Sequence, residues 1–73
     1  MAERLANRLL DLRTEQGLTQ AALAELVGVS RKTINTVENG IFIPSTLLAL
    51  KLARALDRPV EELFSLEPDS EEP

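Results

Sequence analysis

The sequence predicts an all-α protein, a compact bundle of five helices, from three observations. Apolar residues make up 44% of the 73 residues but only two residues are aromatic, and Leu and Ala supply most of the remainder, which favours helix over sheet. Apolar residues recur at intervals of three and four, the spacing of one helix face. Ser, Thr and Gly stand where the apolar segments begin and end, as helix caps do.

The first helix is expected where Leu5, Leu9 and Leu12 fall on one face of a segment without Gly or Pro. Gly17 follows as a candidate C-cap, because glycine readily adopts the left-handed conformation in which many helices end. Two short helices come next. Thr19 is a suitable N-cap for the second helix, residues 20–27.

Ser30 is in turn a suitable N-cap for a third helix, residues 31–38. The residues IFIP then form an extended connection, and Ser45 can cap a fourth helix over residues 46–56 that is apolar around most of its circumference. Pro59 fits the first turn of a short fifth helix. The sequence LFSL follows it and can extend as a short C-terminal strand.

The segment VGVS joins the second and third helices by a short turn that contains glycine, which is the helix-turn-helix pattern. Ala24 is small enough for the two helices to cross closely, and Gly28 can take a positive φ without a Cβ penalty. Val29, Ile34 and Val37 can seal the angle from the inside. Together these residues are a much more specific signal than any one of them.

The net charge of −4 is unevenly distributed along the chain. Residues 1–66 hold eight basic and eight acidic side chains, whereas residues 67–73 (EPDSEEP) add four acids and no base. Because this segment also has two Pro and no apolar residue, we expect a solvated, disordered tail. The acidic total is therefore weak evidence against nucleic-acid binding, which depends on the local field.

Several classes of function are disfavoured by what the sequence lacks. There is no Cys or His for a thiolate site, a metal or a proton shuttle at neutral pH. Glu61 and Glu62 are adjacent on a helix and point about 100° apart, so they do not converge on one ligand. No nucleophile has a base beside it. We expect no enzyme, no cofactor, no metal and, since no apolar run approaches ~18 residues, no membrane span.

The sequence LRTEQGLTQAALAELVGVSRKTINTVENG, followed by PSTLLALKLARAL and VEELF, resembles the Cro/C1-type (Xre-like) helix-turn-helix family over about residues 5–64. The resemblance implies a lambda-repressor-like DNA-binding domain over residues 1–66, with the motif at about residues 19–38. It looks closest to short stand-alone members, which act as homodimers on double-stranded DNA. A cytoplasmic protein encoded by a bacterium, an archaeon or a phage is then expected.

The resemblance also implies which residues of the third helix face the bases: Ser30, Arg31, Lys32, Asn35 and Thr36. Arg31 can reach guanine O6 and N7 with two bonds, Asn35 can do the same for adenine, and Lys32 can instead bond a phosphate. The alternative for Arg31 and Lys32 is a solvated helix face, but their place in the motif favours DNA contact. Asn35 and Thr36 stay open between base contact and plain exposure.

Phosphate contacts are implied at Thr19, Gln20 and Asn39, the first two of which begin the second helix. The chain departs from the family after ENG, where many members have Lys and then a polar residue two positions on. Ile41 and Ile43 stand there instead, which removes possible phosphate contacts and leaves apolar surface in need of cover.

Arg13 and Glu38 match a partly buried ion pair of the family that links the first helix to the end of the third. We interpret this pair as structural, with a secondary role in positioning the recognition helix. Apolar residues in the C-terminal half exceed what a lone fourth helix can bury, and such a surface usually marks an interface. The predicted dimer contact comprises Ile41, Phe42, Ile43, Leu47, Leu48, Leu50, Phe64 and Leu66.

Two functions are compatible with these residues. The first is a sequence-specific transcriptional regulator, a repressor that binds an inverted repeat as a homodimer with residues 30–38 in the major groove. The second is an antitoxin-like interaction module that neutralises an unknown protein partner and regulates its own promoter. A palindrome in the gene's own promoter favours the first, and a neighbouring gene for a small toxic enzyme favours the second.

Overall fold

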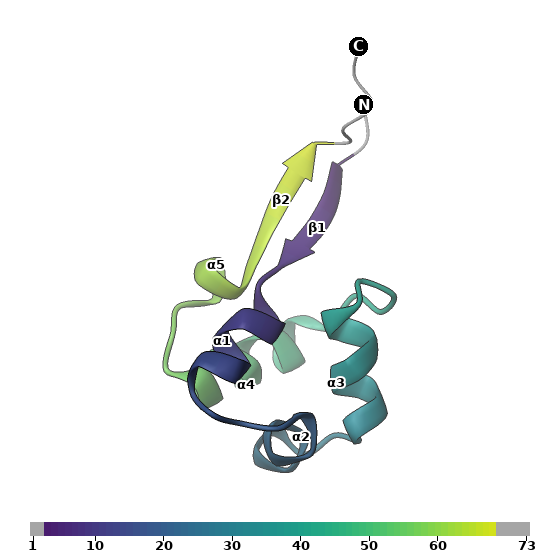
Figure 1. Cartoon of the computed structure of the whole chain (residues 1–73). Coiled ribbons are helices and arrows are strands. Elements are labelled where there is room, and N and C mark those ends of the chain that lie inside the picture. Colours follow the sequence, from purple (N-terminus) through teal and green to yellow (C-terminus); the bar gives the residue numbers. More distant parts are fainter. Residues whose placement is uncertain (1–2, 69–73) are drawn as a thin grey trace.

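The computed structural model describes residues 3–68 and contains the five helices that the sequence predicts (Figure 1). Their bounds are α1 (Leu9–Glu15), α2 (Gln20–Val27), α3 (Arg31–Glu38), α4 (Thr46–Leu56) and α5 (Val60–Leu63). A two-stranded antiparallel sheet joins the two ends of the chain, β1 (Glu3–Asn7) with β2 (Phe64–Pro68). The prediction of a five-helix bundle is therefore confirmed, with a small sheet added to it.

The prediction that the first helix begins near Leu5 is wrong. Leu5 lies in β1, where it is paired with Leu66, and α1 begins only at Leu9. Asn7 marks the change, because its Oδ1 accepts a hydrogen bond of 3.0 Å from the Leu9 N–H and so turns the chain into the helix. The helical spacing of Leu5 was misleading because a partner strand distant in sequence decided its conformation.

The prediction of a C-terminal strand is confirmed, but the strand is longer than LFSL allows. β2 includes Glu67 and Pro68, the first two residues of the expected tail. Arg4 and Glu67 face one another across the sheet with an exposed ion pair of 3.4 Å. The rest of the expected tail, residues 69–73, lies outside the described residues.

The two strands form an arm that projects from the helical body, as Figure 1 shows, and the molecule measures 41 × 21 × 21 Å. Asn7 fastens the base of this arm to the body, because its Nδ2 donates to the Val37 carbonyl oxygen at 3.1 Å near the end of α3. Within residues 3–68, no helix is both long and apolar enough to cross a lipid bilayer.

The core lies where the inner faces of the five helices meet. Its buried side chains come from every helix, so that each helix depends on the others to cover its apolar face. They are Leu9, Leu12, Leu23, Ala24, Val27, Ile34, Val37, Leu48, Leu52, Ala53, Leu56 and Leu63. Leu, Ala, Val and Ile fill this space, which is why a chain with two aromatic residues still has one continuous core.

Three hydroxyl groups cap the three longest helices, as the sequence predicts. Thr19 accepts a hydrogen bond from the N–H three residues on at 3.0 Å, Ser30 does so at 3.2 Å and Ser45 at 3.1 Å. Each cap satisfies one of the N–H groups that the first helical turn leaves without a partner. The caps therefore fix where α2, α3 and α4 begin.

Gly28 ends α2 in the left-handed conformation, with φ 77° and ψ 34°. Its N–H bonds to the Ala24 carbonyl oxygen at 2.8 Å, and the Val29 N–H bonds to the same oxygen at 3.0 Å. Apart from Gly28 itself, its two chain neighbours and the nearby backbone of its own helix, no heavy atom lies within 4 Å of the position that a Cβ would take at Gly28. The glycine is thus required by backbone conformation and not by lack of space.

We expect Gly28→Ala to lower the free energy of unfolding by about 1–2 kcal/mol, because alanine is strained in this conformation. Gly28→Asn should cost less, since Asn visits the left-handed region more readily. Urea unfolding followed by circular dichroism measures both changes. Glu25→Ala, on the exposed side of α2, serves as a control. Equal stabilities for the Ala and Asn variants would contradict this explanation.

Candidate nucleic-acid interface

Helices α2 and α3 meet through small and β-branched side chains, which places the opposite side of α3 in solvent. Ala24 of α2 and Ile34 and Val37 of α3 are all buried in the core. The residues between them, VGVS, make the turn that begins at Gly28. Because Ile34 and Val37 fix the rotation of α3 about its axis, the residues on its other side are exposed as a group.

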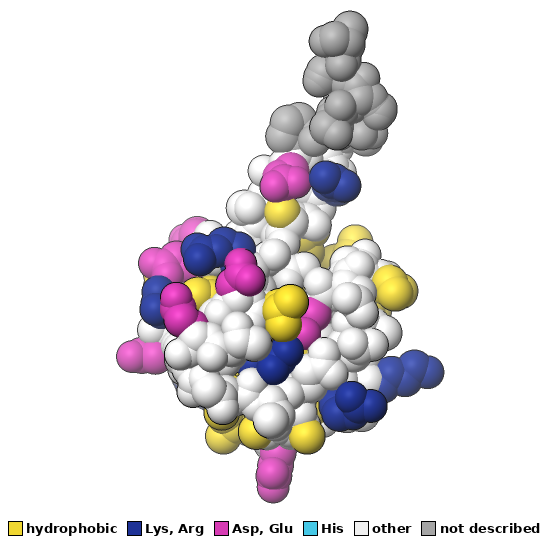
Figure 2. Space-filling view, viewed as in Figure 1, with side chains coloured by type: hydrophobic (Ala, Val, Ile, Leu, Met, Phe, Trp, Pro, Cys, Tyr) yellow, Lys and Arg dark blue, Asp and Glu magenta, His cyan; other side chains and the backbone are white. Residues whose placement is uncertain are grey.

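The exposed side of α3 begins with two basic residues. Arg31 and Lys32 occupy its first turn and are exposed, and this turn contains no acid. In Figure 2 two basic groups project from the body at the end where α3 begins, whereas acidic groups gather on the opposite side. The local charge of this surface is therefore positive although the chain as a whole is acidic.

The other three residues predicted to face the bases differ in their exposure and in the hydrogen bonds that they already form within the protein. Asn35 is exposed on the same side of α3 as Arg31, one turn further on. The Ser30 hydroxyl is engaged as the helix cap and lies 3.0 Å from the Thr33 hydroxyl. Thr36 is half-buried, and its hydroxyl donates to the Thr33 carbonyl oxygen at 3.0 Å. Arg31, Lys32 and Asn35 are consequently the most available of the five.

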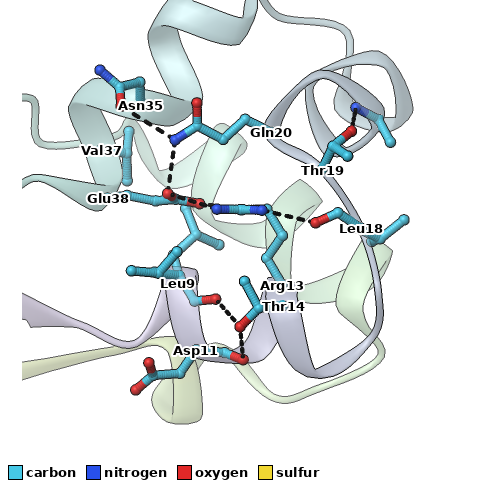
Figure 3. Close-up of polar contacts among 12 residues, drawn as sticks. Leu9, Asp11, Arg13, Thr14, Leu18, Thr19, Gln20, Asn35, Val37 and Glu38 are labelled. Carbon is cyan, nitrogen blue, oxygen red and sulfur yellow. Dashed lines mark hydrogen bonds and ion pairs between the residues drawn. The ribbon is translucent and has the colours of Figure 1, made fainter.

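Gln20, the first residue of α2, connects these side chains to the interior. Its Nε2 donates to Glu38 Oε1 at 2.9 Å and to Asn35 Oδ1 at 3.2 Å (Figure 3). Its Oε1 accepts a hydrogen bond from Arg31 Nη1 at 3.3 Å. Gln20 thus contacts three residues of α3 at once.

The interior end of this network is the ion pair of Arg13 with Glu38, whose side chains are 10% and 4% exposed. Arg13 Nε donates to Glu38 Oε2 at 2.6 Å, and Arg13 Nη2 donates to Oε1 at 3.2 Å. Arg13 Nη1 donates to the Leu18 carbonyl oxygen at 2.8 Å. The pair therefore joins α1 to the end of α3, as the resemblance implied, and the bond to Leu18 adds the α1–α2 turn.

Asn39 and Thr19, two predicted phosphate contacts, lie at helix ends close to this network. Asn39 is exposed at the end of α3, and its Nδ2 donates to Asn35 Oδ1 at 3.3 Å. The Thr19 hydroxyl is used in capping α2. The structure thus gathers Gln20, Arg31, Asn35 and Asn39 on one surface, with Thr19 at its border.

Two bonds of this region were not found by sequence reasoning. The bond from Gln20 to Glu38 was missed because Gln20 was considered only as a phosphate contact. The bond from Asn7 to Val37 was missed because the residues around Asn7 were expected to be helical. Asn7, two residues before Leu9, is a signal that could have indicated the start of α1 there, since Asn favours positions near helix starts.

The apolar residues predicted to form a dimer contact are divided by the structure. Leu48 is only 8% exposed and belongs to the core, so its assignment to the surface is wrong for the single chain. Phe64 is half-buried against the core. The remaining six are exposed, namely Ile41, Phe42, Ile43, Leu47, Leu50 and Leu66.

The exposed apolar residues directly after α3 lie beside that helix. The N–H groups of Ile41 and Phe42 both donate to the Thr36 carbonyl oxygen, at 2.9 and 3.2 Å. Ile41 and Phe42 line one hollow with Lys32 and Thr36. This apolar surface therefore reaches the recognition helix itself.

The arrangement is suited to binding. Within residues 3–68, no three acidic side chains gather closely enough to hold a metal ion. Every buried side-chain nitrogen and oxygen in that part of the chain has a hydrogen-bond partner. Docking to a fixed anionic surface requires a basic, exposed helix face whose position is held by hydrogen-bonded polar groups beneath it. The start of α3 has these features.

Removing either member of the Arg13–Glu38 pair should be far more harmful than removing both. We expect Arg13→Met and Glu38→Leu each to cost about 3–5 kcal/mol, because the remaining charge is left buried without a partner. The double variant should be more stable than either single variant, since no buried charge remains. Urea unfolding of the four proteins measures this. A double variant no more stable than the single variants would contradict the assignment.

Comparison with known proteins identifies relatives of the whole folded part. The Helix-turn-helix family HTH_3 matches residues 9–63. The HTH-type transcriptional regulator YgzD of Bacillus subtilis is 39% identical over 66 residues, which are 90% of this chain and 100% of that protein. An HTH-type transcriptional regulator of Methanothermobacter thermautotrophicus is 52% identical over 58 residues, 78% of this chain and 84% of that protein.

Among solved structures, the restriction-modification controller protein C.AhdI of Aeromonas hydrophila is similar, with a TM-score of 0.74 and 47% sequence identity. The similarity covers 78% of this chain and 86% of that one. The family match over residues 9–63 includes α2, the turn and α3. The chain therefore belongs to the Cro/C1-type (Xre-like) helix-turn-helix family, HTH_3, whose members here are DNA-binding transcriptional regulators.

Proposed function

We propose that this chain is a sequence-specific repressor that binds an inverted-repeat operator as a homodimer. The observation that carries the proposal is the exposed basic start of α3. There Gln20 accepts a hydrogen bond from Arg31 and donates one to Glu38, which belongs to the buried ion pair. A side chain that is held before binding loses less conformational freedom when it meets a base. Such a surface favours specific over purely electrostatic binding.

Base reading is assigned to Arg31 and Asn35, with α3 in the major groove. Arg31 keeps four of its five N–H donors free of the bond to Gln20, enough for a two-bond contact to a guanine. Lys32 next to it carries a compact charge that suits a phosphate. The hydroxyl groups of Ser30 and Thr36 already form hydrogen bonds within the protein. We therefore assign these two residues to van der Waals contacts with the groove.

The backbone contacts are assigned to the start of α2 and the end of α3. The N–H groups in the first turn of α2 can bind a phosphate together, as helix N-termini do. Because the Gln20 side chain is occupied on three sides, its phosphate contact is proposed to come from its main chain. Asn39 lies at the other end of the same surface and would reach a second phosphate.

The homodimer is proposed from apolar residues that a monomer leaves in water. Ile41 is 74% exposed and Ile43 is 71% exposed, and both lie in the segment directly after α3. Leu47 and Leu50 continue this apolar character on α4. A symmetric contact through these residues would place two α3 helices in successive major grooves, ~34 Å apart. Occupation of a promoter by such a dimer would exclude the polymerase.

The alternative is an antitoxin-like module, and the same apolar segment is what favours it. Ile41 and Ile43 could be covered by a different protein in place of a second copy. The oligomeric state of the purified chain distinguishes the two functions, since a homodimer forms without any other component. A monomer that becomes dimeric or DNA-binding only with a co-expressed neighbour would support the alternative.

We expect Arg31→Ala to weaken binding to the operator by about 1–3 kcal/mol and to relax base preference at one position in each half-site. Lys32→Ala is the matched control, since it removes the same charge from the adjacent residue. It should weaken binding to all sequences about equally and reduce the salt dependence by roughly one phosphate contact. Selection from a random duplex pool, followed by titration at two salt concentrations, measures both. Unchanged affinity and preference for the Arg31 variant would refute its role.

We expect the melting temperature of the wild-type chain to rise with protein concentration, because association stabilises the folded state by mass action. Ile43→Asp should lower the melting temperature and weaken operator binding without altering base preference. Leu10→Asp, at an exposed leucine of α1 outside the proposed contact, is the control. Sedimentation that shows a monomer at tens of micromolar, with a melting temperature independent of concentration, would rule out the homodimer.

A further inference from the structure

The buried carboxylate of Glu38 fixes the direction of the hydrogen bonds around Gln20. A carboxylate only accepts hydrogen bonds, so the Gln20 atom that lies 2.9 Å from Glu38 Oε1 has to be the amide nitrogen. The amide oxygen of Gln20 then faces the other way and accepts the bond from Arg31 Nη1 at 3.3 Å. The orientation of the Gln20 amide thus follows from the ion pair beneath it.

The same reasoning extends to Asn35. Gln20 Nε2 has two hydrogens, of which one goes to Glu38 and the other to Asn35 Oδ1, at 3.2 Å. Asn39 Nδ2 donates to that same oxygen at 3.3 Å. Because an amide oxygen has two lone pairs, both acceptor positions of Asn35 are filled by the protein. The exposed Asn35 side chain therefore offers DNA only its NH₂ group.

The neighbouring side chains on the exposed surface of α3 are donors as well. Arg31 and Lys32 have N–H groups and no acceptor. In the major groove guanine presents two acceptors, O6 and N7, whereas adenine presents one acceptor next to an amino donor. The donors of Arg31, Lys32 and Asn35 are complementary to the two acceptors of guanine, whereas the amino group of adenine finds no free acceptor on any of these three side chains.

We propose that Glu38 and Asn39 set Asn35 as a donor, Glu38 through Gln20, so that Asn35 selects guanine over adenine. An Asn side chain without these bonds would instead pair with adenine through one donor and one acceptor, as the sequence alone suggested. Glu38, Gln20 and Asn39 are in this respect positioning residues. The inference rests on the proposed sequence-specific DNA binding and adds the base that one residue prefers.

The first experiment tests the wild-type chain. Selection from a random duplex pool with the wild type and with Asn35→Ala identifies the base pair whose preference depends on Asn35. Dissociation constants are then measured for duplexes that carry guanine, adenine or 7-deazaguanine at that position. Guanine should be bound about 5- to 100-fold more tightly than adenine. 7-Deazaguanine should fall between them, because it lacks the N7 acceptor. Adenine bound as tightly as guanine would overturn the proposal.

The second experiment releases the Asn35 oxygen. The double variant Gln20→Leu, Asn39→Ala removes both donors to Asn35 Oδ1 and leaves the Arg13–Glu38 pair in place. Its preference at the same position should shift from guanine toward adenine. The ratio of the two affinities is compared within one protein, so a general loss of binding does not affect it. A double variant that keeps the full guanine preference would contradict the proposed role of the network.

The matched control adds Asn35→Ala to the double variant, which should then discriminate little between the two bases. Circular dichroism checks that all variants keep their helices. If selection yields no preferred sequence for the wild type, the proposed function fails and this inference fails with it. If a preferred sequence exists but Asn35→Ala alters no position, or if adenine is favoured, only this inference fails.

Discussion

The ion pair between Arg13 and Glu38 is the interaction on which the rest of the structure depends. Its side chains are 10% and 4% exposed, so both charges have lost most of their water. Three N–H groups of Arg13 and the amide of Gln20 replace that water with fixed hydrogen bonds. The pair therefore adds little to stability on balance, but its hydrogen bonds join the end of α3 to α1 and to the start of α2.

The two sides of α3 have different tasks, which a small regulator has to meet with few residues. One side of α3 has to be apolar, because Ile34 and Val37 complete the core that five short helices share. The other side has to be polar and basic, because it meets phosphates and base edges. The acidic residues lie largely elsewhere on the visible face, so a negative net charge is compatible with a locally positive surface (Figure 2).

The arm formed by β1 and β2 is the part of the structure that the local sequence pattern did not predict correctly. Leu5 has the spacing of a helix residue, yet it pairs with Leu66, which is 61 positions away in the sequence. Pairing of this kind depends on where the ends of the chain are brought by the packing of α1 and α5, and no local preference encodes that. Packing of α4 against the core likewise buried Leu48, which looked like a surface residue because α4 is apolar around most of its circumference.

The sequence by itself determined the five helices, their caps at Thr19, Ser30 and Ser45, and the turn at Gly28, because periodicity and cap chemistry act over a few residues. It also indicated the motif, the exposed basic pair and the partners Arg13 and Glu38 through its resemblance to a family. Only the tertiary structure decided which amide atoms face outward at Gln20 and Asn35. That choice depends on a carboxylate brought from the end of α3 to the start of α2, where it can accept a hydrogen bond but never donate one.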